Sequence, residues 1–301
     1  MRVVTLLVRA RILAFFLVFL SAGQVLAQVG NEWIDYSQVY YKIPVAKDAI
    51  YRLTGDDLFS AGVPAGVNPA AIKLYHRGIE QAITVDAGAD GVLNGSDYIE
   101  FYGQKNDGTL DAKLYQPQSA QPHTYYNLYS DTTAYFLSVE GVPGRRIPQS
   151  NDPAGSLTPS AFHIAESLLV NLGGYSTGRE ENDVQLTAFD YGEGWTGERL
   201  LQTQAQNYTV TSIVNGYQTA GKPTVEILLQ GWGPMAHEAE IFVGPGLRSV
   251  GTFNFTGFEP SKAQLQVEWS DIAADGSLLV RVRCNGVAGA PDRLSASYIK
   301  V

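Results

Sequence analysis

The sequence predicts an all-β protein that consists of two β-sandwich domains, the second of jelly-roll type, after a cleaved signal peptide. Beyond the N-terminal segment, no apolar pattern of helical period reaches a dozen residues. Short strand-like runs instead alternate with turns rich in Gly, Pro, Asn and Asp. The 301 residues include 17 Tyr, 12 Phe and 4 Trp, which supply large apolar side chains for such cores.

Residues 1–27 have the composition of a secretory signal peptide. They contain three arginines and no acidic residue, an apolar core over Ile12–Leu20, and small residues at the exit around Val25–Ala27. A single-pass anchor is the rival interpretation, but the apolar stretch is shorter than the roughly 20 residues that a bilayer requires. We therefore expect a mature N-terminus at Gln28 and an exported protein of the periplasm, the outer-membrane surface or the extracellular space.

Charge and cysteine content exclude several classes of protein. The signal segment holds three of the 21 basic residues and none of the 30 acidic ones, so the remaining 18 basic and 30 acidic residues give a net charge of −12. Such a surface disfavours nucleic acid as a partner. Cys284 is the single cysteine, which excludes an internal disulfide and a cysteine-based metal site within one chain.

A change in composition divides the chain into domains. Residues 141–160 contain four prolines and three glycines, which interrupt any strand ladder, and they include the basic pair Arg145–Arg146. We therefore expect an N-terminal β domain over 28–142, a linker over 143–160 and a C-terminal β-sandwich domain over 161–301.

Turn residues delimit the elements of the first domain. Thr54 or Asp56 provides a helix N-cap and Gly62 a helix end, and Arg77–Gly78 suits a hairpin turn. Residues 97–102 alternate polar and apolar side chains between two Gly-containing turns, as a strand does. The elements expected in order are strands at 40–45 and 49–53, a helix at 54–61, hairpin strands at 71–76 and 81–85, and strands at 97–102, 125–128 and 134–139.

The second domain shows only short strand-like runs. We expect strands at 162–169, 184–189, 199–203, 208–214, 224–230, 239–243, 249–255, 263–269, 278–284 and 295–300. This density of strands and turns favours two packed sheets of jelly-roll type. Gly192–Trp195 is expected in a loop. In the last strand, Leu294, Ala296 and Tyr298 are expected on one side.

The stretch Asp97–Gly108 resembles the non-catalytic N-terminal region of gingipain-like cysteine peptidases of family C25, in particular the type IX secretion sortases of Bacteroidetes. Further pieces of the resemblance are residues 31–36, 40–42, 55–62, 131–137 and 192–195. The peptidase domain of that family is absent from the sequence. The resemblance implies that this chain packs on a peptidase domain or a secretion-system protein, with a docking face around the strand at 293–301. A fragment, a stand-alone paralogue and a split partner of a separate peptidase chain remain three open explanations.

The residues themselves argue against catalysis by this chain. A cysteine peptidase needs a thiolate beside a histidine, so only Cys284 with His76, His123, His163 or His237 could serve. His237 lacks the flanking glycines of the family's catalytic histidine. Cys284 shares one strand face with Val280 and Val282, which predicts a packed thiol. We therefore expect no catalytic residues and no enzyme activity.

Four side chains with hard oxygens surround the turns before the strand at 97–102. Asp86, Asp90, Asn94 and Asp97 offer the ligand chemistry that calcium prefers, although their spacing does not match an EF-hand. Solvated turn carboxylates are the ordinary alternative. Calcium is the one cofactor that the sequence suggests.

Carbohydrate binding is the alternative function. Trp195 and Trp232 lie in Gly-rich stretches, and exposed aromatic rings on a secreted sandwich stack on sugars. Aromatic residues at strand ends are also ordinary core or rim residues of a sandwich. Both interpretations stay open at this point.

Overall fold

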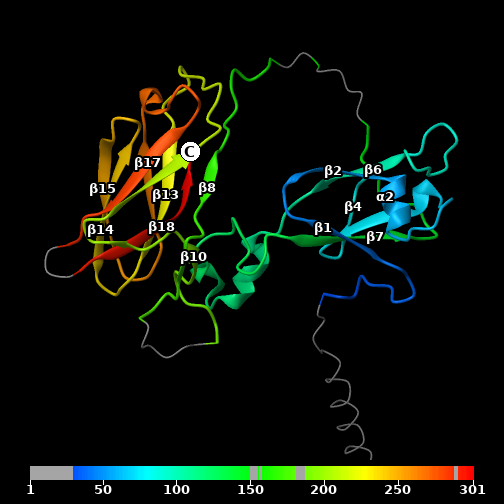
Figure 1. Cartoon of the computed structure of the whole chain (residues 1–301), viewed down its shortest axis with the longest axis horizontal. Coiled ribbons are helices and arrows are strands. Elements are labelled where there is room, and N and C mark those ends of the chain that lie inside the picture. Colours follow the sequence, from blue (N-terminus) through cyan, green and yellow to red (C-terminus); the bar gives the residue numbers. More distant parts are fainter. Residues whose placement is uncertain (1–29, 150–154, 156–157, 181–186, 288–290) are drawn as a thin grey trace, which may run out of the picture. The chain divides into compact units, whose positions relative to one another are not determined.

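The computed structural model describes residues 30–149, 155, 158–180, 187–287 and 291–301. It confirms an all-β protein built of antiparallel sheets (Figure 1). The described chain divides into two compact units, one of residues 30–105 and 132–149 and the other of residues 106–131 and those after 150. The signal segment expected at 1–27 lies outside the described residues. No helix among the described residues is long and apolar enough to cross a membrane.

Two antiparallel sheets form the first unit. One sheet has the order β1 (Tyr41–Val45), β7 (Thr133–Val139), β3 (Ile72–His76) and β4 (Ile79–Gln81). The other has the order β2 (Ala49–Thr54), β6 (Tyr98–Gly103) and β5 (Thr84–Asp86). Leu74 and Leu137 of the first sheet and Ile99 and Phe101 of the second belong to one buried core cluster, so the alternation that predicted the strand at 97–102 places its apolar side chains inside.

Local signals in the first unit behave as expected. Helix α2 (Gly55–Ser60) starts at Thr54, which forms a reciprocal capping box with Asp57. Arg77 and Gly78 join β3 to β4 with φ of 50° and 79°, the two positive values that a type I′ hairpin turn requires. The expected hairpin arm at 81–85 is divided, however, because β4 and β5 belong to different sheets.

The second unit is a jelly roll. From β11 to β18 its eight strands form two sheets, with the sequence order first-eighth-third-sixth in one and second-seventh-fourth-fifth in the other. The first sheet contains β11 (Leu200–Leu201), β18 (Arg293–Lys300), β13 (Thr224–Gly231) and β16 (Ser261–Gln266), and β8 (Leu168–Val170) also pairs with β18. The second contains β12 (Ala205–Val210), β17 (Leu278–Cys284), β14 (Ala236–Val243) and β15 (Arg248–Thr256). A short 3-10 helix, η5 (Trp269–Asp271), precedes β17.

The segment 106–131 belongs to the second unit, whereas the sequence analysis placed it in the first domain. It contains two 3-10 helices, η3 (Gly108–Leu114) and η4 (Gln118–Ala120), which lie beside the β9 (Gly174–Ser176) and β10 (Gly194–Thr196) pair (Figure 1). The Tyr115 hydroxyl donates to the Glu193 carbonyl at 2.7 Å, and the Tyr126 hydroxyl donates to the Trp195 carbonyl. The strand expected at 125–128 is therefore wrong, because those aromatic residues pack onto the jelly roll without a ladder of their own.

Several expected strands of the second unit differ from the structure. The run expected at 162–169 forms a strand only over β8, and the run at 184–189 falls in part on residues 181–186, outside the described part of the chain. Gly194 and Trp195, expected in a loop, lie in β10. The run at 278–284 agrees with the bounds of β17.

A bulge in β18 reverses the expected side of Tyr298. The register between β13 and β18 shifts at Leu228–Leu229, so Leu294, Ala296 and Ile299 join the core while Tyr298 turns to the other face. There its ring contacts those of His123 and Tyr125. β18 is flanked by β13 on one side and by β8 and β11 on the other, and its central residues are buried. The docking face expected around this strand is therefore covered within the unit.

The first residues of the expected linker are part of the first unit. The Gly144 amide donates to the Ala70 carbonyl beside η2 (Pro69–Ala71), and the Ile83 amide donates to the Arg145 carbonyl. The Arg146 guanidinium donates to the carbonyl groups of Pro69, Ala70, Ile72 and Arg145. These hydrogen bonds hold residues 144–147 against the sheet, so of the linker expected at 143–160 only the residues after 147 can act as one.

We expect a protease of broad specificity, such as subtilisin, to cut the chain first within residues 148–160, which contain no Lys or Arg. The two fragments should stay associated under native conditions, because residues 106–131 of the N-terminal fragment belong to the second unit. Trypsin should leave Arg145–Arg146 intact because a protease needs an extended, accessible backbone and Arg146 is held by four carbonyl groups. Mass spectrometry of the fragments measures the sites. Arg146→Ala should expose the peptide bond after Arg145 and make trypsin cut there several-fold faster. A first tryptic cut after Arg145 in the unsubstituted chain would contradict this assignment.

Candidate functional site

The acidic turns before β6 bring three of the four expected calcium ligands close to Gly88. A Cβ atom built on Gly88 would lie 3.7 Å from Asp97 Oδ1 and 3.9 Å from Asp90 Oδ1, so both carboxylates approach this glycine. Asp86 Oδ1 accepts the Gly88 amide at 3.2 Å. Asp86 also pairs with the Tyr98 hydroxyl, and this pairing raises the Tyr98 pKa. Asn94 donates its side-chain amide to Asp90 Oδ2 at 3.0 Å, which places its nitrogen toward the carboxylate.

The carboxylates of this loop also organise its backbone. Asp90 Oδ1 accepts the Val92 amide at 3.1 Å, and Asp97 Oδ2 accepts the Asn94 amide at 2.7 Å. The hydrogen bond from Val92, followed by that from Asn94, lowers the pKa of Asp90. In the part of the chain that the structure describes, no group of three or more His, Cys, Asp or Glu side chains is placed to hold a metal ion. Calcium binding by Asp86, Asp90, Asn94 and Asp97 stays a prediction.

If Asp90 and Asp97 hold calcium, millimolar calcium should raise the melting temperature of the chain by several degrees, because the ion binds only the native loop. Asp90→Ala should abolish the shift. Asp35→Ala is the matched control, since Asp35 is an exposed turn carboxylate of the same unit that accepts the Ser37 amide at 2.9 Å. Scanning calorimetry with calcium and with a chelator measures the effect. Identical curves in the two buffers would leave the four residues as turn formers.

Cys284, His237 and Asp292 meet in the core of the jelly roll. His237 Nδ1 lies 2.5 Å from Asp292 Oδ1, and the exposed fractions of the two side chains are 0% and 1%. Asp292 Oδ2 accepts the Glu238 amide at 3.0 Å. Burial raises the pKa of the Cys284 thiol to about 12, and the Asp292 carboxylate beside it adds to the rise.

This cluster is part of the packed core of the jelly roll. Val280, Val282 and Cys284 are fully buried in one core cluster, as the shared strand face predicted. A thiol with a raised pKa that is closed off from solvent supplies neither thiolate nor a route for substrate. The sequence analysis considered His237 with Cys284 but missed Asp292, which lies 55 residues from His237 and carries no local signal.

The two tryptophans considered for sugar stacking are both anchored by their indole nitrogens. Trp195 donates to the Leu128 carbonyl at 3.0 Å, its ring meets that of Tyr175 edge-on, and 37% of the residue is exposed. Trp232 donates to Ser295 Oγ at 2.8 Å, and Arg199 lies over its ring. Both residues therefore have a structural role at the rim of the sheet that contains β18.

His123 is a buried group that the sequence analysis left as an ordinary histidine. Its Nδ1 accepts the Tyr125 amide at 3.2 Å, whereas its Nε2 has no hydrogen-bond partner among the described residues. Rings of Tyr125, Tyr126 and Tyr298 surround it. Burial, with a smaller effect of Lys262, lowers the His123 pKa to about 4.

Comparison with solved structures finds a similar fold in dimeric latent PorU from Porphyromonas gingivalis, with a TM-score of 0.55 and 14% sequence identity. The match covers 87% of this chain and 24% of the PorU chain. The carbohydrate-binding module CBM36 in complex with calcium and xylotriose matches 45% of this chain and 98% of its own, with a TM-score of 0.27 and 17% identity. BuGH86 in complex with neoagarooctaose matches 89% and 32% of the two chains, with a TM-score of 0.25 and 10% identity.

The likeness to PorU shows that the two proteins share a fold over most of this chain, which spans about a quarter of the PorU chain. The other two TM-scores are too low to support an argument about sugar or calcium. No protein-family model and no curated protein matches the sequence. The comparison therefore shows a shared fold and assigns no family.

Proposed function

We propose that this chain is an exported, non-catalytic interaction module that packs on a gingipain-like peptidase domain. The fold shared with PorU over 87% of the chain is the observation that carries the proposal. The resemblance of Asp97–Gly108 and the other matching stretches to the N-terminal region of gingipain-like sortases supports the proposal from the sequence alone.

The electrostatics and burial of the cysteine support the non-catalytic part of the proposal. The one thiol of the chain is buried, and its pKa is raised well above the range in which a thiolate forms at neutral pH. The partner peptidase would therefore supply the chemistry, and this chain would supply a folded surface. A contact of about 800 Å² per partner is sufficient for a stable complex.

The purified chain should bind a purified gingipain-like peptidase domain saturably, with a Kd of about 1 µM or lower, and should itself hydrolyse no Arg or Lys peptide substrate. Biolayer interferometry measures binding, with papain as a cysteine peptidase of a different fold for control. Hydrolysis that Cys284→Ala abolishes would overturn the non-catalytic assignment. Equal binding to papain, or no binding to the gingipain-like domain, would overturn the assignment of a gingipain-like peptidase domain as the partner.

Carbohydrate binding is the outcome that this experiment must separate from peptidase binding. Retention of the chain on an insoluble polysaccharide, and its loss in Trp195→Ala, would assign a sugar site at the rim of β10. Trp269→Ala is a suitable comparison because Trp269 also donates its indole N–H to a backbone carbonyl, that of Gly221, at 2.7 Å in the same unit.

A further inference from the structure

One long edge strand of the jelly roll carries none of the features that normally protect a sheet edge. β12 has six residues, Ala-Gln-Asn-Tyr-Thr-Val, without a charge, a proline, a glycine or a bulge. Natural edge strands are kept from pairing with other chains by shortness, charge, proline or bulges. The remaining edge strands of the described sheets follow this rule. Six of them have three residues or fewer, namely β4, β5, β8, β9, β10 and β11. The others are β1 with Lys42 and Pro44, β2 with Arg52, β15 with Arg248 and a bulge, and β16 with Lys262.

The backbone of β12 presents unpaired hydrogen-bonding groups on its outward side. The Cys284 amide donates to the Gln204 carbonyl at 2.9 Å, and pairing in an antiparallel ladder alternates, so Gln206, Tyr208 and Val210 face β17. The amide and carbonyl groups of the alternate residues 205, 207 and 209 therefore point away from the sheet. Among the described residues, their one partner is the Gln206 side-chain amide, at 3.3 Å from the Asn207 carbonyl.

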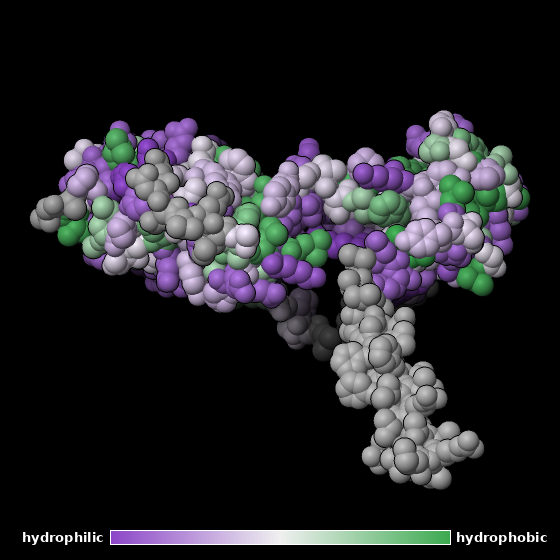
Figure 2. Space-filling view, turned by 90° about the horizontal axis from the view of Figure 1, so that it is seen from below, coloured by the Kyte–Doolittle hydropathy of each residue, from purple (hydrophilic) through white to green (hydrophobic). Residues whose placement is uncertain are grey.

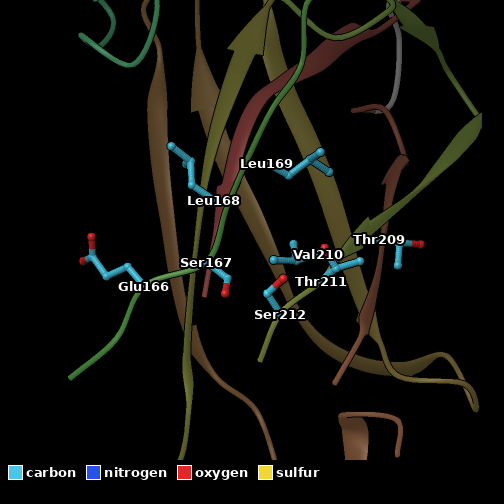
Figure 3. Close-up of a pocket in the computed structure, with 8 residues that line it drawn as sticks. All are labelled: Glu166, Ser167, Leu168, Leu169, Thr209, Val210, Thr211 and Ser212. Carbon is cyan, nitrogen blue, oxygen red and sulfur yellow. The ribbon is translucent and has the colours of Figure 1, made fainter. Parts of the chain in front are cut away.

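A pocket of about 240 Å³ adjoins this edge. It lies between Glu166–Leu169 and Thr209–Ser212, on the side of the sandwich where β8 ends one sheet and β12 ends the other (Figure 3). Ser212, the last residue of the segment Thr209–Ser212, has φ of 69°, a left-handed conformation that is uncommon for serine. Any strand that paired with β12 would direct its inner side chains toward this pocket.

Exposed apolar side chains continue from the pocket along the two segments that line it. Phe162 and Tyr217 stack with ring centroids 5.6 Å apart, and Ile164 and Val214 are 86% and 65% exposed. In the view of Figure 2, hydrophobic residues lie in small groups among hydrophilic ones. We call Phe162, Ile164, Leu168, Val214 and Tyr217 the edge patch.

A positively charged side chain, that of Arg281, lies on the outer face of the sheet beside the β12 edge. Arg281 of β17 pairs in register with Asn207 and donates to its Oδ1 at 2.7 Å, but it makes no ion pair in the part of the chain that the structure describes. An added strand would lie roughly 9.5 Å from β17, two strand spacings, which an arginine and a glutamate side chain bridge. The neighbouring Arg283 is already neutralised by Glu240.

We propose that β12 is a strand-addition site for an extended segment of another polypeptide, with apolar side chains toward the pocket and an acidic side chain opposite Arg281. Main-chain hydrogen bonds would supply affinity, and the pocket, the edge patch and Arg281 would supply specificity. The site lies on the second unit and does not depend on the proposed packing against a peptidase domain.

The test uses a labelled synthetic peptide, acetyl-Thr-Val-Glu-Val-Glu-Val-Thr-amide, and fluorescence anisotropy with the full chain. We expect saturable binding and slower amide exchange confined to residues 205–211. A peptide of the same composition without alternation should bind at least tenfold more weakly. Replacement of both glutamates by lysine should weaken binding several-fold at low salt, because Arg281 would then face a like charge.

Thr209→Pro is the decisive variant. It removes an outward amide and no bond to β17, so it should abolish peptide binding while the melting temperature stays close to that of the unsubstituted chain. Thr252→Pro is the matched control on β15, the opposite edge of the same sheet, where the Gly257 amide pairs with Met235 and the alternation turns the Thr252 amide outward. Thr252→Pro should leave the Kd for the peptide within about twofold of that of the unsubstituted chain. Thr209→Glu keeps the backbone intact and places a like charge beside the outward glutamates of the peptide, so it should weaken binding without loss of folding and covers the case in which the proline variant misfolds.

Three results would overturn the proposal: no saturable binding at millimolar peptide, binding that survives Thr209→Pro and Thr209→Glu, or equal binding of the non-alternating peptide. Sedimentation of the chain alone is run in parallel. Self-association that Thr209→Pro removes, without peptide binding, would make a second copy of the chain the occupant of the edge and would overturn the assigned partner.

Discussion

Replacement of Asp292 by alanine is expected to lower the free energy of unfolding of the jelly roll by about 3–5 kcal/mol. Asp292 is 1% exposed and accepts hydrogen bonds from His237 Nδ1 and the Glu238 amide. Its removal leaves a buried imidazole N–H and a buried amide without partners, and both have lost their hydration. Urea unfolding followed by tryptophan fluorescence measures the change, since three of the four tryptophans lie in this unit.

Asp275→Ala is the control for this effect. Asp275 is an exposed turn carboxylate of the same unit that accepts the Ser277 amide at 2.9 Å, so its loss should shift the urea midpoint far less. A double variant, His237→Leu with Asp292→Ala, should be more stable than the sum of the two single effects predicts, because neither partner is left alone. Equal midpoints for Asp292→Ala and Asp275→Ala would show that the buried pair contributes little.

Acidification from pH 7 to pH 5 is expected to remove about 2 kcal/mol of stability from the jelly roll through His123 alone. The imidazole has a pKa of 6.5 in the unfolded chain and about 4 in the folded one, because burial disfavours its charged form. Between these values the unfolded chain binds more protons, so stability is complete above pH 6.5 and falls as the pH decreases toward 4. Urea midpoints at pH 7, 6 and 5 measure the slope.

His123→Phe should flatten this part of the pH profile, since a phenyl ring fills the same aromatic surroundings without a proton to bind. His163→Phe is the comparison, because His163 is an exposed histidine of the same unit. Parallel profiles for the unsubstituted chain and His123→Phe would mean that the ring is hydrated in solution.

The candidate sites differ in how far apart in the sequence their residues lie. Asp86, Asp90, Asn94 and Asp97 lie within twelve residues, so the sequence alone shows that their oxygens share one loop. The structure adds that the carboxylates of Asp86, Asp90 and Asp97 all approach Gly88 and that Asp86 also pairs with Tyr98. His237 and Asp292 pair across 55 residues, and nothing in either neighbourhood predicts that contact, because only the closure of the jelly roll brings the two segments together.

The fold divides in the same way. Alternation places Val280, Val282 and Cys284 on one buried face, and the Thr54–Asp57 capping box and the Arg77–Gly78 turn form as their residue types require. These features depend on side chains a few residues apart, where period and turn chemistry act. All-β class, sandwich architecture and most strand positions were predictable for that reason.

Tertiary structure alone decided which elements cover which surfaces. The segment 106–131 packs with the jelly roll, a bulge turns Tyr298 away from the core, and Arg146 fastens the expected linker to the first unit. The edge position of β12 follows from the order of strands in its sheet and not from its own six residues. A sequence pattern states that a strand has an apolar side, but the neighbours that cover its edges and faces come from distant segments, whose packing free energy is settled only when the whole sandwich closes.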